Sequence, residues 1–183
     1  DRFNAEQIRL NSHTGTHLDA PFHFFPDGQT IDQLDVSLFQ GDAVIVDLRS
    51  VIHPKEGITV AHLTPYADRI GKDSIVLFAT GWGPKRSFDQ EYQYDWPYLT
   101  GEAAQWLRDK GIKGVGIDAM SMGGWYEGTG RPCHEALLSA GIWILEEIRI
   151  PDELTERGGC YLMTFPLKLQ GFSGAPARAV AAV

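Results

Sequence analysis

A short stretch near the start of the sequence concentrates side chains that can bind a metal ion. His13, His17, Asp19 and His23 lie within eleven residues, and all four occupy odd positions. Side chains alternate along an extended chain, so these four would project to one side of a strand. A helix would turn Asp19 away from the face shared by His13 and His17, and the intervening Thr, Gly and Pro residues are poor helix formers. The spacing therefore predicts an extended segment.

Gly15 lies between the first two histidines and gives this segment a place to bend. In a straight strand, four residues at about 3.3 Å each would separate His13 from His17 by roughly 13 Å, too far for one site. Glycine reaches backbone angles closed to other residues and can fold His13 back toward His17. Imidazole with carboxylate suits zinc, manganese, iron or nickel better than calcium or magnesium. We therefore expect a transition-metal site, against the alternative of buried, hydrogen-bonded or exposed histidines.

The bulk composition is that of one globular domain that can bury a core, with 183 residues, 43% hydrophobic and 22% charged. A formal net charge of −8 argues against nucleic acid or an anionic membrane as a partner. No apolar run approaches the roughly 20 residues that cross a bilayer, and no signal-peptide pattern opens the sequence. The sequence begins at Asp1 without a methionine, which is compatible with a missing leader or N-terminal strand.

Two cysteines, Cys133 and Cys160, are too few for a disulfide scaffold. We therefore expect reduced thiols and a cytoplasmic location. Cys133 precedes His134, but adjacent residues on a regular element point in different directions, so Cys133 is expected to be a small packed side chain rather than a ligand.

Short apolar runs alternate with helical patterns through the rest of the sequence. Runs rich in β-branched residues predict buried strands over residues 43–48, 74–79, 114–118 and 142–145, with further strands over 160–165 and 177–183. Thr59 and Thr100 can cap helices that end at Gly71 and Gly111, and another helix is expected to begin at His134. Segment 85–98 has no clear period and predicts a long loop. The alternation indicates an α/β domain with a mostly parallel or mixed sheet.

The histidine-rich stretch resembles the H-x-G-T-H-x-D-x-P-x-H-F signature of the cyclase family, metal-dependent hydrolases that include bacterial kynurenine formamidases and isatin hydrolases. Its fixed positions are matched by His13, Gly15, Thr16, His17, Asp19, Pro21, His23 and Phe24. The similarity continues to residues 166–168 and 176–179, and so covers nearly the whole chain. It implies one swivelling β/β/α domain over residues 1–183, with a mixed, barrel-like sheet and short flanking helices.

The resemblance also implies that a distant histidine and glutamate complete the metal centre. His134 and Glu146 have the matching spacing of twelve. Glu146 also follows an apolar strand, where carboxylates commonly face a ligand crevice. By that match Glu146, and not Glu147, is the ligand, whereas the residues alone leave either glutamate as a solvated surface group. Asp118, at the end of another strand, is expected to order a loop rather than to bind the ion.

The candidate ligands allow either one ion or two. His13, His17 and Asp19 could hold one ion with an open position for water. Alternatively, Asp19 could bridge two ions about 3.5–4 Å apart. The presence of both His134 and Glu146 favours two divalent ions, with zinc the first choice and manganese the second.

His23 is expected to be the general acid/base, because an imidazole with a pKa near 6.5 can take and return a proton near neutrality. The resemblance places that role here too, and the alternative is a further ligand or a supporting residue. A metal ion lowers the pKa of its bound water and stabilises an oxyanion. An ion of this kind and a group that transfers protons are together sufficient for hydrolysis. We therefore expect metal-activated hydroxide to cleave a C–N amide bond while His23 protonates the leaving nitrogen.

Four aromatic side chains could form a flat substrate pocket, namely Phe22, Phe24, Trp82 and Trp125. The resemblance implies a small substrate that is either a formamide such as N-formylkynurenine or an isatin-like cyclic amide. Residues 121–124 lack the acidic residue that many formamidases carry after the serine, so the substrate stays open. A cyclic ester or polyketide-like substrate is also compatible with these residues, as is a metal-binding module without catalysis. A homo-oligomer, dimer or tetramer, is the expected assembly.

Overall fold

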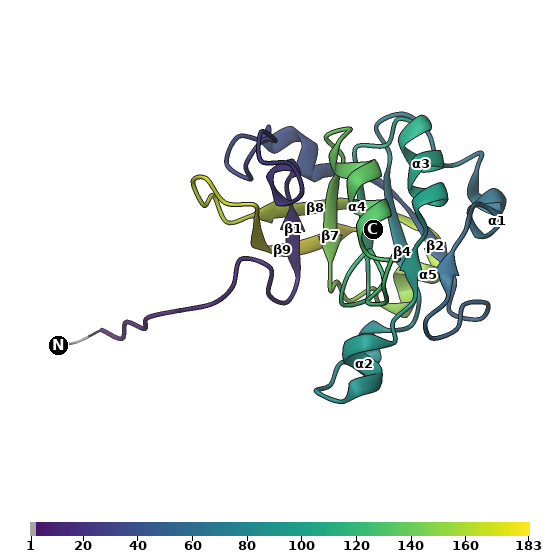
Figure 1. The fold of residues 1–183 in the computed structure, drawn as a ribbon, viewed down its shortest axis with the longest axis horizontal. Helices are drawn as coiled ribbons and strands as arrows, with labels where there is room; N and C mark the ends of the chain where they lie inside the picture. Colours follow the sequence, from purple (N-terminus) through teal and green to yellow (C-terminus); the bar gives the residue numbers. More distant parts are fainter. Residues whose placement is uncertain (1–2) are drawn as a thin grey trace.

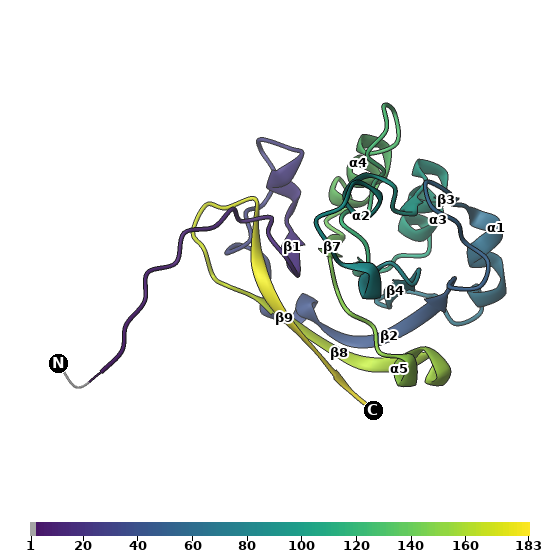
Figure 2. The same ribbon diagram turned by 90° about the horizontal axis from the view of Figure 1, so that it is seen from below.

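The computed structural model describes residues 3–183 (Figures 1 and 2). Within these residues, seven strands close into a barrel in the order β1-β7-β6-β4-β2-β8-β9. The strands are β1 (His17–Asp19), β2 (Gln40–Asp47), β4 (Ile75–Ala79), β6 (Gly114–Ile117), β7 (Trp143–Glu146), β8 (Gly159–Pro166) and β9 (Gly174–Ala182). A separate parallel pair joins β3 (Gly57–Ile58) to β5 (Tyr98–Leu99). The expected α/β fold with a mixed, barrel-like sheet is confirmed.

The centre of the barrel wall is parallel and its seam is antiparallel. Strands β2, β4, β6 and β7 run parallel to one another. In contrast, β1 pairs antiparallel with both β7 and β9, and β8 pairs antiparallel with β2 and β9. All five residues of β4 are buried, as expected for a parallel strand covered on both faces. The three residues of β1 therefore close the barrel.

Five short helices flank the barrel: α1 (Val60–Leu63), α2 (Gln90–Tyr94), α3 (Gly101–Asp109), α4 (Arg131–Leu138) and α5 (Asp152–Arg157). This count covers residues 3–183. Figure 2 shows α1, α3 and α4 gathered on one side of β2 and β4, with α5 on the opposite side. None of the helices in the described part of the chain has the length and apolar character that crossing a membrane requires.

Three boundaries differ from the expectations. The helix capped by Thr59 ends at Leu63 instead of Gly71, because Pro65 follows and the chain continues as a 3₁₀ turn over Thr64–Tyr66. Helix α4 begins at Arg131, ahead of His134, with a proline in its first turn, where the missing N–H costs nothing. The loop expected over residues 85–98 contains α2, whose first turn is capped by the Asp89 carboxylate.

Alternation along the strands divides the core into two clusters. Ile45 and Leu77 belong to the cluster inside the barrel, whereas their neighbours Val46 and Phe78 belong to the cluster under the helices. The same alternation holds in β7, where Leu145 joins the barrel interior and Ile144 the helix side. Glu146 has the parity of Ile144, so its side chain faces the space between the barrel and α4.

Candidate metal centre

Strand β1 places two candidate ligands beside a third. His17 lies opposite Glu146 in the antiparallel register, and Asp19 lies opposite Ile144. Residues two apart share a face, so His17 and Asp19 project together while Leu18 packs in the barrel interior. His17 and Asp19 are both buried. Backbone pairing alone therefore brings an imidazole and two carboxylates to the helix side of the barrel.

The bend expected at Gly15 is confirmed. Gly15 has φ +62°, in the left-handed region that glycine enters without strain. The turn brings the ring of His13 within 5.1 Å of the ring of His17, measured between centroids. The Nδ1 atom of His13 then lies 2.7 Å from the Asp19 carboxylate, and its Nε2 lies 2.8 Å from the hydroxyl of Ser173.

Gly174 on β9 permits this close approach. A Cβ atom at Gly174 would lie 2.5 Å from the carbonyl oxygen of Leu18 and 2.7 Å from the ring of His13. Both distances are too short for real atoms, so only glycine lets β9 pair with β1 beneath the His13 ring. Residues near the end of the chain thus shape the site that begins at its start.

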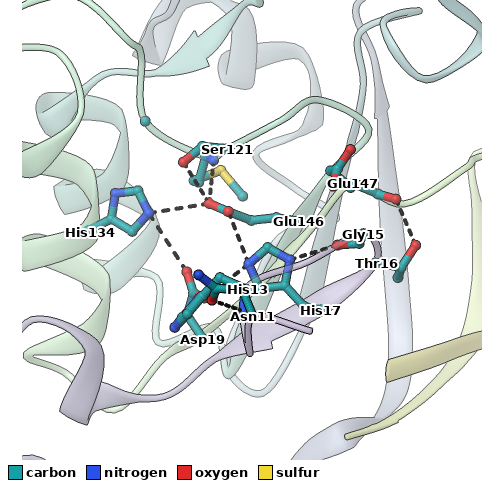
Figure 3. Close-up of polar contacts among 12 residues, drawn as sticks. Asn11, His13, Gly15, Thr16, His17, Asp19, Ser121, His134, Glu146 and Glu147 are labelled. Carbon is teal, nitrogen blue, oxygen red and sulfur yellow. Dashed lines mark hydrogen bonds and ion pairs between the residues drawn. The ribbon is translucent and has the colours of Figure 1, made fainter. Parts of the chain in front are cut away.

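Helix α4 and the loop after β6 supply the other side of the site (Figure 3). The Nε2 atom of His134 lies 3.3 Å from one Glu146 oxygen and 3.8 Å from an Asp19 oxygen. The same Glu146 oxygen accepts hydrogen bonds from the Ser121 hydroxyl at 2.8 Å and the Met122 backbone N–H at 2.6 Å. The other Glu146 oxygen lies 3.4 Å from His17 Nε2.

The buried atoms at the centre of this cluster fit a cation. His17 donates from Nδ1 to the carbonyl of Gly15, and His134 donates from Nδ1 to the carbonyl of Gly130. Each ring therefore turns Nε2 toward the carboxylates, the arrangement that prepares histidine for a metal ion. His17 Nε2 and Asp19 Oδ2 are buried without a hydrogen-bond partner in the described structure. Such atoms are costly to bury unless an ion or a proton joins them.

The cluster contains two overlapping groups of possible ligands that share Asp19. One joins His13, His17 and Asp19, and the other joins Asp19, His134 and Glu146. All five candidate ligands from the sequence are therefore brought together. The sharing of Asp19 is what a carboxylate bridge between two ions would require.

In the absence of an ion, the groups of the cluster strongly shift one another's pKa values. Burial alone would lower the pKa of His17, but the carboxylates of Asp19 and Glu146 outweigh it and raise that pKa to about 9. Burial alone would raise the pKa of Asp19, but hydrogen bonds from His13 and His17 hold it well below its usual range. The pKa of His134 is raised despite burial, through its contacts with Cys133 and Glu146. The cluster therefore attracts positive charge.

His23 lies at the open mouth of the site. It follows Pro21 in a 3₁₀ turn, and its ring stacks on His13 with 4.1 Å between centroids. Burial lowers the pKa of His23, and the neighbouring His13 and His134 lower it further, while the Asp19 charge opposes them. A neutral imidazole with access to solvent can exchange protons near neutrality.

A hollow of about 400 Å³ covers the cluster. It is lined by His13, His17, His23, Phe24, Met120, Ser121, Gly130, Arg131, His134, Glu146 and Glu147. Phe24 stacks on His134 with 4.8 Å between ring centroids and an interplanar angle of 9°. Phe24 thus forms one aromatic wall of the hollow, and its role in binding a substrate stays a prediction.

The other three predicted pocket aromatics do not line this hollow. Trp82 is 2% exposed and belongs to the core, because its indole N–H is bonded to the Tyr92 carbonyl and its ring stacks on Tyr92. Its place in the core does not support the predicted pocket role of Trp82. Trp125 is exposed and packs against Tyr94, and Phe22 is exposed in the turn that carries His23.

Supporting residues were harder to foresee. Ser121 and Ser173 each contact a candidate ligand from loops distant in sequence, and nothing in their local pattern distinguishes them. Asp118 does order a loop, accepting hydrogen bonds from Thr80 and Gly81. Cys133 is fully buried and lies nearest the Nδ1 atom of His134, so it packs rather than facing the cluster.

A family model described as "Putative cyclase" matches residues 2–123, more than half of the sequence. The chain belongs to the cyclase family. A kynurenine formamidase of Bacillus cereus is 32% identical over 179 residues, covering 97% of this chain and 79% of that protein. A kynurenine formamidase of Bacillus cytotoxicus is 30% identical over 177 residues, with coverage of 97% and 79%.

Solved structures of other cyclase-family proteins share the fold. A potential metal-dependent hydrolase with cyclase activity superimposes with a TM-score of 0.82 and 34% identity, covering 96% of this chain and 81% of that one. An isatin hydrolase bound to the product analogue thioisatinate superimposes with a TM-score of 0.88 and 27% identity, and the match covers 100% of this chain and 76% of that one. For the isatin hydrolase A of Labrenzia aggregata the TM-score is 0.87 and the identity 26%, and the match covers 98% of this chain and 77% of that one. The protein is accordingly an enzyme, a hydrolase of the cyclase family.

Proposed function

We propose that this cyclase-family enzyme is a metal-dependent amidohydrolase that cleaves the C–N bond of a small aromatic formamide, N-formylkynurenine being the leading candidate. One observation carries the proposal: two buried imidazoles, on His17 and His134, present Nε2 to the carboxylates of Asp19 and Glu146. Among these atoms, His17 Nε2 and Asp19 Oδ2 have no hydrogen-bond partner in the described structure. The names of the Bacillus relatives support the formamide.

The ligands would be His13, His17, Asp19, His134 and Glu146, holding one or two divalent ions, zinc first and manganese second. Such an ion, when bound, supplies water of lowered pKa and positive charge for a developing oxyanion. Ser121 and Met122 hold the Glu146 carboxylate in place through their hydrogen bonds to it. The backbone carbonyls of Gly15 and Gly130 fix the tautomers of His17 and His134.

His23 would move the proton to the leaving nitrogen. Its ring lies at the mouth of the hollow, stacked on His13 and facing the edge of Phe24. Burial lowers the pKa of His23, which favours the neutral imidazole that can accept a proton and return it. Phe24, stacked on His134, would support the flat face of an aromatic substrate.

A His23→Gln variant tests this assignment. We expect it to retain the wild-type metal content, measured by elemental analysis, while hydrolysis of N-formylkynurenine falls by roughly 10²–10⁴-fold, the usual contribution of a general acid/base. His62→Gln is the matched control, because His62 lies in the capping box of α1. Full activity in His23→Gln with metal bound would refute the role of His23. Protein that binds no zinc or manganese would refute the metal centre.

A cyclic amide is the second candidate substrate. The similarity to isatin hydrolases extends over the whole chain at 27% identity. Parallel ultraviolet assays on isatin and N-formylkynurenine with zinc- and manganese-loaded protein decide between them by the ratio of kcat/KM.

We also propose a homo-oligomer. Residues 3–11 are exposed and extend from the body in both views (Figures 1 and 2), and they carry the exposed apolar side chains of Phe3, Ile8 and Leu10. A second copy could cover them. Light scattering should give a dimer or tetramer for the unaltered chain and a smaller species after all three are changed to serine. The free thiols of Cys133 and Cys160 are consistent with the proposed cytoplasmic location.

A further inference from the structure

A second hollow adjoins the metal centre. It measures about 520 Å³ and is lined by Gly15, Arg86, Ser87, Phe88, Tyr92, Gln93, Met120 and Glu147. Met120 and Glu147 also line the hollow over the metal ligands, so the two spaces meet along these side chains. A molecule whose amide lies at the ligands could therefore extend into the second hollow.

One cation and one anion face this second space. The Arg86 guanidinium lies 3.4 Å from the Glu147 carboxylate, and the hydroxyl of Tyr92 donates to the same carboxylate oxygen at 3.2 Å. Arg86 Nη1 and Glu147 Oε2 have no hydrogen bond or ion pair to residues 3–183. The hollow thus offers a free donor group and a free acceptor of opposite charge, side by side.

The backbone conformation at Glu147 directs its carboxylate to the second hollow, whereas the carboxylate of Glu146 faces the candidate ligands. Glu147 has φ +52°, an unusual value for a residue with a side chain. Its carbonyl accepts hydrogen bonds from the Thr16 hydroxyl at 2.7 Å and from Arg86 Nη2 at 2.8 Å. In Figure 3, Glu146 reaches toward His17 and His134, whereas Glu147 lies beyond it, beside Gly15 and Thr16.

We propose that the second hollow binds the α-amino acid group of the substrate, with Arg86 on the α-carboxylate and Glu147 on the α-ammonium. The inference rests on the proposed amide hydrolysis at the adjoining ligands and narrows its substrate class to aryl amides that carry a zwitterionic side chain. A guanidinium N–H binds a carboxylate through a charge-assisted hydrogen bond, and a carboxylate binds an ammonium likewise. Phe88, exposed at the edge of the hollow, adds an apolar surface for the connecting chain.

The first test compares two formamides. N-formylkynurenine carries the amino acid group, and formanilide lacks it. We expect the ratio of their kcat/KM values to fall by about tenfold or more in Arg86→Gln and in Glu147→Gln, chiefly through KM, with part of the ratio restored in Arg86→Lys. Lys85→Gln is the matched control, because it removes a neighbouring surface charge that pairs with Glu91 outside the hollow, and it should leave the ratio unchanged.

The second test measures binding without turnover. Calorimetry on metal-stripped protein should show that kynurenine binds about tenfold more tightly than 2-aminoacetophenone, which has the same ring without the amino acid group. Arg86→Gln should remove that advantage. Circular dichroism confirms that each variant is folded.

The outcomes separate the inference from the proposed function. If the variants lower hydrolysis of both formamides equally and leave kynurenine binding unchanged, Arg86 and Glu147 only support Glu146, and the inference is overturned while amide hydrolysis stands. If neither formamide is hydrolysed but kynurenine binding depends on Arg86, the hollow is an amino acid site and the proposed function fails. Equal binding of kynurenine and 2-aminoacetophenone also overturns the inference.

Discussion

Glu146 and Glu147 are adjacent in sequence, yet they belong to two sites that are built in different ways. Glu146 reaches the candidate metal centre because strand register sets it opposite His17. Glu147 reaches the second hollow because two side chains, from Thr16 and Arg86, hold its backbone in a left-handed conformation. The comparison teaches that the candidate metal centre depends on backbone pairing, whereas the second hollow depends on side-chain hydrogen bonds between distant loops.

The largest effect should follow the loss of the residue common to both ligand groups. Asp19→Asn keeps the shape of the side chain but removes the charge that both groups share. We expect metal content to fall to background and hydrolysis of N-formylkynurenine to fall by at least about 10³-fold, since charge stabilisation by the ion supplies several kcal/mol. Asp42→Asn, on an exposed position of β2, is the control. Retention of both metal and activity would show that the shared carboxylate is dispensable.

Removal of metal should destabilise the barrel rather than the second hollow. An ion that binds only the folded state adds about 2.7 kcal/mol to the free energy of unfolding at a hundred times its Kd. We expect stripping with a chelator to lower the urea midpoint and zinc to restore it. Hydrogen exchange should locate the change in β1 and β7. An equal change around Arg86 and Tyr92 would mean that the two sites are not independent.

Gly174→Ala tests the role of backbone approach. The added Cβ would meet the Leu18 carbonyl and the His13 ring. We expect a loss of about 1–3 kcal/mol of unfolding free energy, as for overpacking, together with weaker zinc binding. Gly71→Ala is the matched control, because its Cβ would meet nothing within 4 Å. Unchanged zinc affinity in Gly174→Ala would show that the position of His13 does not depend on the close packing of β9.

The last prediction concerns the pH dependence of stability in the stripped protein. The pKa of His17, 6.5 in the unfolded chain, is raised to about 9 in the fold without metal. The protonated ring therefore stabilises the stripped protein fully below pH 6.5, and this contribution is lost as pH rises through about 9. Urea unfolding between pH 6.5 and 9.5 should show that decline in stripped protein and a weaker one in His17→Gln. A stability that rises over this range would contradict the assigned sign.

The sequence predicted the parts of the site that follow local rules. The placement of His17 and Asp19 two residues apart, on one face of a strand, and the bend at Gly15 are properties of neighbouring residues. The structure confirms both. Glu146 was singled out by its place after an apolar strand, but its pairing with His134 came from the family resemblance, because their meeting depends on how α4 packs beside β7. Their place in the cluster follows the resemblance, and their role as ligands stays a prediction.

What could not be predicted depends on contacts between distant segments. The direction of the Trp82 ring follows from its bond to the Tyr92 carbonyl and from the loop that Asp118 orders. The pairing of Arg86 with Glu147 joins residues 61 positions apart. No periodicity in the sequence encodes either contact, so neither the buried position of Trp82 nor the second hollow was foreseen.

Strand β1 is three residues long, carries two of the candidate ligands and is the only element that separates β7 from β9 in the described barrel. If β1 detaches, the unpaired N–H and C=O groups of two longer strands face solvent, which is how sheets from different molecules join edge to edge. Ions that hold His17 and Asp19 would also guard against this self-association. The solubility of the chain would then depend on whether the candidate metal centre is occupied.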